Sequence, residues 1–310
     1  MVCARAKRPC VGLASLSRLR CCNSLNRESD TMKRGLFEPA AQAGGAEQPY
    51  RRGNFSCAYE WLEGVEGVDA LLQVLDALSA ADAQHRYLCT LDDINQCSYT
   101  CGHAGQDDRL YLEEPDGEEE GGGIDWDDSA QEAAWEQASL QHRLAQLNNP
   151  DVAQSWDQVC GTLSTSATDV KALLQANHEP DALLDEVVYV QRIPVTSDDL
   201  MIAAQPNGYF SADWDTFQNH AIIRHLATQY GYRFFGMGAS WMGFVRPAPP
   251  SAEQCARLVA DLKDLYGRKR EEVFAHAGWA ELQQLLQGQR LLMLGYVENM
   301  AESLGLEDED

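Results

Sequence analysis

No stretch of this 310-residue chain is apolar for long enough to span a membrane, and its first residues lack the apolar segment of a secretory signal. Basic residues are scarce too: 24 Lys and Arg stand against 48 Asp and Glu, so the net charge is −24. Nucleic acids and anionic membranes are bound by clustered Lys and Arg, so neither is expected as a partner. We expect a cytoplasmic protein whose partner is a basic protein.

A complete catalytic or cofactor-binding motif is also missing. Gly236 and Gly238 begin a dinucleotide-binding pattern, but Trp241 stands where its third glycine should be. A nucleophile elbow around Ser240 fails by one residue. The stretch "RFFGMGASWMGFVR", residues 233–246, is instead predicted to form two strands joined by a turn in which glycine permits positive φ. We therefore expect no cofactor and no nucleophile at Ser240.

The charge that is present is spread unevenly. Residues 1–27 carry six basic residues and no acid, whereas residues 107–136 carry thirteen acids and one base. Such biased, low-complexity stretches bury too little apolar surface to offset the entropy lost on ordering. Three segments are therefore expected outside the folded units: an unstructured leader at 1–48, an acidic linker at 115–128 and an acidic tail at 303–310. Within the leader, Met32 is expected to be the true first residue of the protein.

Hydrophobic periodicity predicts folded units on both sides of the linker. Residues 49–114 are expected to form a small β-α-β-β unit, with strands at "NFSCAYEWL", "HRYLCTL" and "DRLYLEE" and a polar connection at "DDINQCSYTCGHAGQD". Residues 129–180 are expected to be helical. Residues 181–302, with a strand at "LMIAAQP", give the order β-β-α-β-β-α-α-β. That order is typical of an α+β domain with a mainly antiparallel sheet and helices on one face.

Cysteine is abundant, with ten residues, but no secretory signal points to an oxidising compartment. Free structural thiols are therefore the favoured interpretation. Cys97 and Cys101 have the spacing of half a zinc site, and His103 lies close by, so a zinc-bearing adaptor is an alternative. A redox-active disulfide is a further alternative.

Acidic and aromatic residues gather near the start of the helix predicted from "DWDTFQNHAIIRHLATQYG". Asp213 and Asp215 flank Trp214, and one of the two acids is expected to cap this helix. Alternation along the following strand places Trp241 on a partly open side. The two tryptophans would then anchor a partner while the two acids supply charge. The alternative is a hydrolase-like active site built from four side chains: Asp213, Asp215, His220 and Ser240.

The run "IIRHLATQYGYRFFGMGASWMGFVRPAPPSAEQCARLVADL" resembles the end of a bacterial domain family of unknown function. The shared pattern is helix, "YG", strand, strand, "PP" and helix, and it includes no catalytic signature. Such domains recur among genes of toxin–immunity systems. The resemblance therefore implies a non-enzymatic binding protein, most concretely an immunity or inhibitor protein that neutralises a basic toxin.

Overall fold

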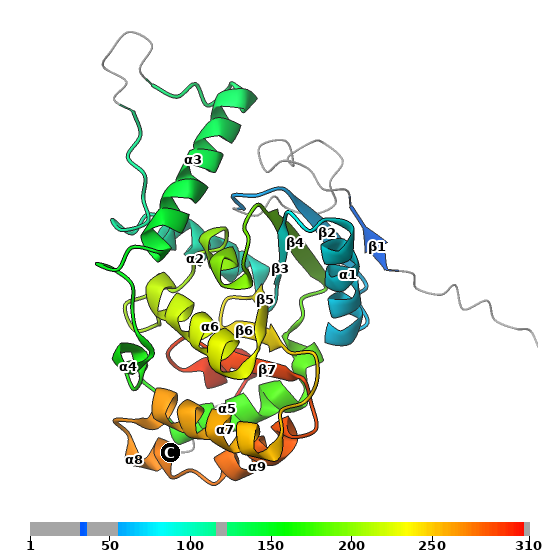
Figure 1. The fold of residues 1–310 in the computed structure, drawn as a ribbon, viewed down its shortest axis with the longest axis vertical. Helices are drawn as coiled ribbons and strands as arrows, with labels where there is room; N and C mark the ends of the chain where they lie inside the picture. Colours follow the sequence, from blue (N-terminus) through cyan, green and yellow to red (C-terminus); the bar gives the residue numbers. More distant parts are fainter. Residues whose placement is uncertain (1–31, 36–54, 116–122, 307–310) are drawn as a thin grey trace, which may run out of the picture. The chain divides into compact units, whose positions relative to one another are not determined.

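The computed structural model describes residues 32–35, 55–115 and 123–306 (Figure 1). These residues form an α+β fold on one seven-stranded mixed sheet in the order β1-β2-β4-β3-β5-β6-β7. Within them, no helix combines the length and the apolar character that a membrane crossing requires. The strands are β1 Lys33–Arg34, β2 Tyr59–Glu63, β3 Arg86–Thr90, β4 Val187–Ile193, β5 Arg233–Met237, β6 Trp241–Val245 and β7 Leu291–Gly295.

Neighbouring strands are antiparallel except for β3 and β5, which run parallel with Cys89 opposite Gly236. Strand β3 belongs to the expected small unit at 49–114, yet it lies between β4 and β5 of the expected domain at 181–302. The two units thus share a single sheet, which corrects the expected boundary between them. Pairing β3 on both sides satisfies backbone groups that a separate small unit would leave open at its edges.

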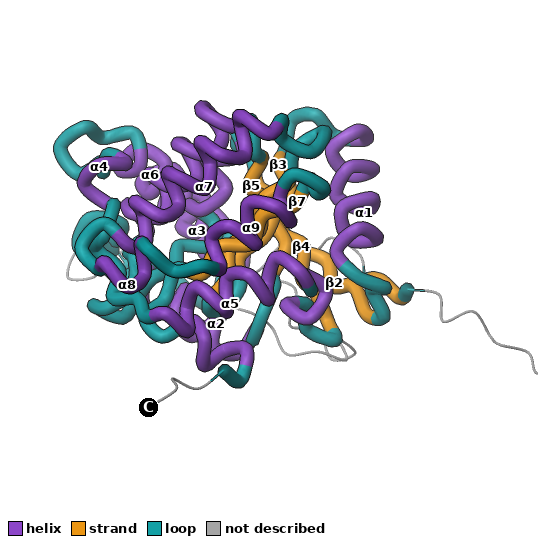
Figure 2. Tube along the Cα trace, turned by 90° about the horizontal axis from the view of Figure 1, so that it is seen from below, coloured by secondary structure: helices purple, strands orange, loops and turns teal. Residues whose placement is uncertain are grey.

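Helices pack on this sheet and on each other. Helix α1 contacts β3, α6 contacts β5, and α5 contacts β7. Helix α5 also contacts α9, and these two helices lie side by side in Figure 2. The helices are α1 Val68–Ala81, α2 Ile94–Ala104, α3 Ser129–Leu147, α4 Trp156–Val159, α5 Ala167–His178, α6 Thr216–Tyr230, α7 Ala252–Gly267, α8 Glu271–Phe274 and α9 Gly278–Leu286. Short 3₁₀ turns lie at η2 Pro180–Leu183, η3 Asp198–Ala203 and η4 Met300–Leu304.

Local signals in the sequence explain where the best-predicted helices begin and end. Asp215 and Gln218 form a reciprocal capping box at the start of α6, so Asp215 is the acid that caps this helix. Gly231, with φ 69°, ends α6 in the left-handed conformation that glycine adopts without strain. Ser251 and Gln254 form a second reciprocal capping box, at the start of α7.

Three predictions of local structure are wrong: two expected strands and one expected connection. The stretch "DRLYLEE" forms turns and extended chain rather than a strand. The expected strand at "LMIAAQP" is largely the 3₁₀ turn η3, in which the consecutive residues Met201, Ile202 and Ala203 are buried. The expected polar connection contains α2, which Asp93 caps by accepting a hydrogen bond from the backbone N–H of Gln96.

The expected leader is ordered in part. Lys33 and Arg34 form β1, which pairs with β2, and the Arg34 guanidinium donates to both carboxylate oxygens of Glu60. Glu60 is buried, so this charge-assisted pair favours ordering of β1. The prediction of an unstructured 1–48 is thus wrong for these residues. Residues 1–31 and 36–48 of the leader, 116–122 of the linker and 307–310 of the tail lie outside the described residues. The tail was predicted to begin too early, because Ser303 and Leu304 belong to η4 and Ser303 accepts a hydrogen bond from the buried Trp241.

Candidate functional site

The loops after β3 and β5 meet at one edge of the sheet, because parallel strands end on the same side. Asp92 follows β3, and its carboxylate accepts hydrogen bonds from the backbone N–H groups of Ser240 and Trp241 at 2.9 and 3.2 Å. A Cβ on Gly238 would overlap the Asp92 carboxylate. Gly238 is therefore required for this close approach, and not for the positive φ that the sequence suggested.

Two buried amide side chains, from Gln205 and Asn207, also hydrogen-bond to the end of β5 and to the turn that follows it. Gln205 donates from Nε2 to the carbonyl oxygen of Met237 at 2.6 Å and to the Sγ of Cys97 at 3.2 Å. Asn207 donates from Nδ2 to the carbonyl oxygen of Gly238 at 3.3 Å. The β5–β6 turn, α2 and the chain after η3 are thus held together by satisfied polar groups, which makes a rigid support for neighbouring surfaces.

Helix α2 separates the three side chains that a zinc-bearing adaptor needs. Cys97 and Cys101 lie one turn apart on its buried face, whereas His103 is half-buried and stacks on Tyr209. The Cys101 thiol and burial hold the pKa of the Cys97 thiol well above its usual range. Among the described residues, no three His, Cys, Asp or Glu side chains are placed to hold a metal ion.

The two acids of the hypothetical active site serve different local structures. Asp215 caps α6 and accepts a hydrogen bond from Nη2 of Arg109 at 2.8 Å. Asp213 accepts from the backbone N–H of Glu298 at 2.9 Å, and burial raises the pKa of its carboxyl to about 6. Each carboxylate therefore already has a structural partner.

The other two candidate catalytic residues also have partners of their own. His220 is buried, and its Nε2 lies 3.2 Å from a carboxylate oxygen of Asp199. Ser240 is held at the β5–β6 turn by Asp92, as described above. A nucleophile needs its base within hydrogen-bonding distance, and here His220 and Ser240 each contact a different carboxylate. The predicted set therefore does not form a catalytic constellation.

Both tryptophans expected to anchor a partner are buried. Trp214 is 1% exposed and Trp241 is 0% exposed, and their indole N–H groups donate to Thr162 and Ser303 at 2.9 and 2.8 Å. All five residues of β6 are buried, so both sides of this strand are covered and alternation creates no open face. The expectation that Trp241 lies on a partly open side is wrong.

Exposed aromatic side chains lie instead beside α2. Tyr99, Tyr209 and Phe210 are 51%, 45% and 48% exposed, although large apolar side chains usually bury most of their surface. His103 stacks on Tyr209 with ring centroids 4.7 Å apart and packs edge-on against Tyr99 at 4.4 Å, while Phe210 lies 5.3 Å from Tyr209. We call these four residues the aromatic patch.

A turn at Gly208 positions Tyr209 and Phe210, two of the four residues of the aromatic patch. Gly208 has φ 99°, and a Cβ there would overlap the carbonyl oxygen of Trp214. Only glycine fits this turn, which leaves Tyr209 and Phe210 on the surface. The sequence "PNG" at 206–208 is typical of a turn, but Tyr99 and His103, which contact Tyr209, come from α2, a helix that the sequence did not reveal.

Acidic groups border the aromatic patch. His103 and Tyr209 line a cavity of about 330 Å³ together with Asp107 and Asp215. Arg109 joins the two carboxylates: it donates from Nε and Nη2 to Asp107 and from Nη2 to Asp215. One cation between two carboxylates leaves a net negative charge next to exposed rings.

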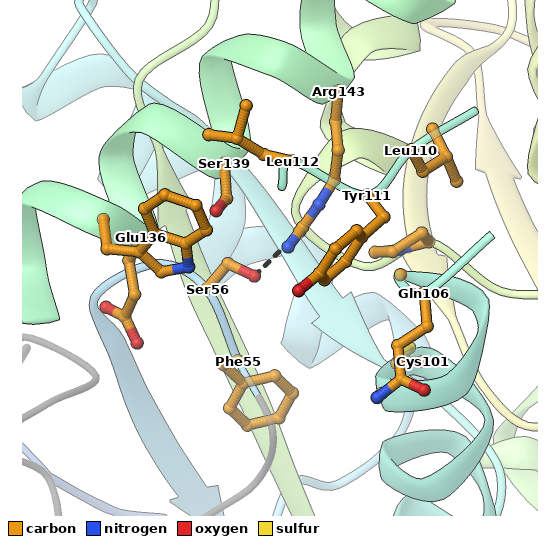
Figure 3. Close-up of a pocket in the computed structure, with 14 residues that line it drawn as sticks. Phe55, Ser56, Cys101, Gln106, Leu110, Tyr111, Leu112, Glu136, Ser139 and Arg143 are labelled. Atoms are coloured by element: carbon orange, nitrogen blue, oxygen red, sulfur yellow. Dashed lines mark hydrogen bonds between the residues drawn. The ribbon is translucent and has the colours of Figure 1, made fainter. Parts of the chain in front are cut away.

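A second cavity, of about 320 Å³, adjoins the end of α2 (Figure 3). Gln106 lines both cavities. The distinctive group here is Arg143 of α3, whose guanidinium points toward Ser56 and donates from Nη1 to its Oγ at 2.9 Å. We call this space the Arg143 cavity.

Comparison with protein-family models, with curated proteins and with solved structures finds no match to this chain. The resemblance of residues 222–262 to a family found near toxin–immunity genes stays a prediction. Arguments about function therefore depend on the geometry and charge of the sites described above.

Proposed function

We propose that this protein is a non-enzymatic binding module that holds a basic protein through the aromatic patch. The observation that carries the proposal is the group of stacked, exposed rings bordered by Asp107 and Asp215 in a chain of net charge −24. Exposed Tyr and Phe supply large contact area at low entropic cost and are enriched at the centres of protein interfaces.

The chemistry of the patch favours an arginine- or lysine-rich partner segment. A guanidinium stacks on aromatic faces and pairs with carboxylates, and both groups lie side by side here. The protein makes the same kind of contact internally, where the Arg109 guanidinium lies 4.4 Å from the centre of the Phe217 ring. An immunity or inhibitor protein against a basic toxin is the most concrete form of this function.

A capture experiment with matched variants tests the proposal. Full-length protein, the double variant Tyr209→Ala with Phe210→Ala, and the control Phe274→Ala are immobilised and exposed to host lysate. Phe274 is 42% exposed but belongs to α8, outside the patch. We expect a basic protein to bind the unaltered chain and the control, and the purified partner to bind the double variant more weakly by about 2 kcal/mol or more.

Two results would contradict the proposal. One is a captured protein that binds the double variant as tightly as the unaltered chain. The other is a partner with a net negative charge, because acidic groups beside the patch would repel it. Either result would leave the aromatic patch without a role in holding a basic partner.

A further inference from the structure

Among the described residues, only neutral groups accept hydrogen bonds from the guanidinium of Arg143. Its Nη1 donates to Ser56 Oγ and to the carbonyl oxygen of Ala203, at 2.9 and 3.1 Å. Its Nε is buried without a hydrogen-bond partner, and Nη2 forms no hydrogen bond with the described residues. No carboxylate in the described part of the chain forms an ion pair with it. A desolvated cation without a counterion is costly, so this arrangement favours an anion from outside.

Two neighbours affect the charge of the guanidinium: the Cys57 thiol and the Glu136 carboxylate, whose negative charge acts to raise the pKa of Arg143. Burial raises the pKa of the Cys57 thiol to about 12, so this neighbour carries no charge near neutral pH. Burial also lowers the pKa of Arg143, although the guanidinium remains charged at neutral pH. Glu136 lines the same cavity and would oppose a second negative charge on any ligand.

The walls of the Arg143 cavity have the mixed character of a small-molecule site. Phe55, Tyr111 and Trp135 supply aromatic surface, and Ser56 and Ser139 supply hydroxyl groups. A volume of about 320 Å³ lies at the lower end of the range for ligand sites, which suits a ligand of one ring or a short chain.

We propose that the Arg143 cavity binds a small monocarboxylate with an apolar body, its carboxylate on the guanidinium of Arg143 and its apolar part against the aromatic wall. A guanidinium pairs with carboxylate in a planar, charge-assisted geometry that a neutral group cannot reproduce. One cation facing one nearby acid suits a monoanion better than a phosphate dianion.

Calorimetric titration of the full chain with phenylacetate tests this site. Phenylacetamide, which has the same shape without the charge, and inorganic phosphate serve as comparison ligands. We expect one phenylacetate per chain, with both comparison ligands binding at least about tenfold more weakly. Absence of phenylacetate binding at millimolar concentration, or equal binding of the amide or of phosphate, would overturn the proposal.

Variants separate the site from the rest of the molecule. Arg143→Gln should weaken phenylacetate binding at least about tenfold, whereas Arg224→Gln, on an exposed position of α6, should not change it. If Arg143→Gln fails to fold, Ser139→Leu should block the cavity while leaving the guanidinium in place. Unchanged binding in Ser139→Leu or in folded Arg143→Gln would sink the assignment.

This site is independent of the aromatic patch. The double variant Tyr209→Ala with Phe210→Ala should bind phenylacetate like the unaltered chain. Loss of phenylacetate binding in that variant would contradict a separate site in the Arg143 cavity. Failure of partner capture would leave the cavity experiment unaffected.

Discussion

At the scale of single residues, burial shows that Trp241 stabilises the fold rather than contacts a partner. Trp241 has its indole ring in the core and its only polar atom satisfied by Ser303. A ring of this size makes many close contacts, and each of them contributes to stability because protein interiors are densely packed. Trp241 is therefore a structural residue.

Substitution of Trp241 by Ala should lower the free energy of unfolding by about 3–5 kcal/mol, because it leaves a large cavity and an unpaired Ser303. Urea denaturation followed by circular dichroism measures this change. Trp126→Ala is the matched control, since Trp126 is 50% exposed and its loss should cost about 0.5 kcal/mol or less. Equal stability of the two variants would contradict the buried position of Trp241.

Prediction from sequence worked for residues whose role is local. The cap at Asp215 depends on the helix that follows it within three residues, so the sequence contains the whole signal. The exposure of Tyr99 and Tyr209 depends on packing between α2 and the turn at Gly208, which lie far apart in the chain. No local pattern encodes that contact, and for this reason the binding surface was placed on the wrong aromatic residues.

At the scale of elements, the pairing of β3 with β5 joins the β1-β2-β4-β3 part of the sheet to the β5-β6-β7 part. Asp92 links the two strand ends through backbone N–H groups of the β5–β6 turn. Burial raises the pKa of the Asp92 carboxyl to about 7, and the hydrogen bonds from Ser240 and Trp241 offset part of that rise. The contribution of Asp92 to the stability of this contact should therefore depend on pH.

The Asp92→Asn variant should reveal this sensitivity. A folded-state pKa above the unfolded value means that the contribution to stability is present below about pH 4 and lost as the pH rises through about 7. Over this window the free energy of unfolding of the unaltered chain should fall, relative to the variant, by up to about 1 kcal/mol per pH unit. Denaturation at several pH values measures it, with the surface variant Asp76→Asn as control.

Parallel pH profiles for the unaltered chain and Asp92→Asn would show that Asp92 ionises with an ordinary pKa. A residual slope in the variant is expected, because burial also raises the pKa of Asp213 to about 6. Only the difference between the two profiles therefore reports on Asp92.

The elements that could be predicted are those with a strong apolar period and a cap. Helix α7 has both, and the start of α6 follows the cap at Asp215 that the sequence indicated. Helix α2 buries mainly cysteine, threonine and alanine, so its apolar face has little contrast. The 3₁₀ turn η3 buries consecutive residues, which resembles a strand from a fully covered sheet.

At the scale of the whole molecule, the net charge of −24 acts over a longer range than any single contact. Charges of one sign steer an oppositely charged partner toward the surface, and dissolved salt screens this attraction beyond about 10 Å. Charge should therefore control how fast the partner is captured, while the aromatic patch controls how long it stays.

Stopped-flow binding with the captured basic partner should separate these two contributions. Raising the salt concentration should slow association steeply and change dissociation little, because steering acts before contact. Tyr209→Ala should instead speed dissociation and leave the salt dependence of association unchanged. An association rate that does not respond to salt would contradict a role for the acidic surface.

The order of strands in the sheet has a consequence for how the chain acquires its structure on the ribosome. Strand β3 pairs with β4 and β5, so Cys89 finds its neighbours only after Val190 and Gly236 have emerged. Strand β7, which completes the far edge, ends at Gly295. Contacts of such high sequence separation slow folding because long loops must close first. The nascent chain should therefore expose β3 as an unpaired edge until β4 and β5 have been synthesised, a period in which chaperones protect such edges from aggregation.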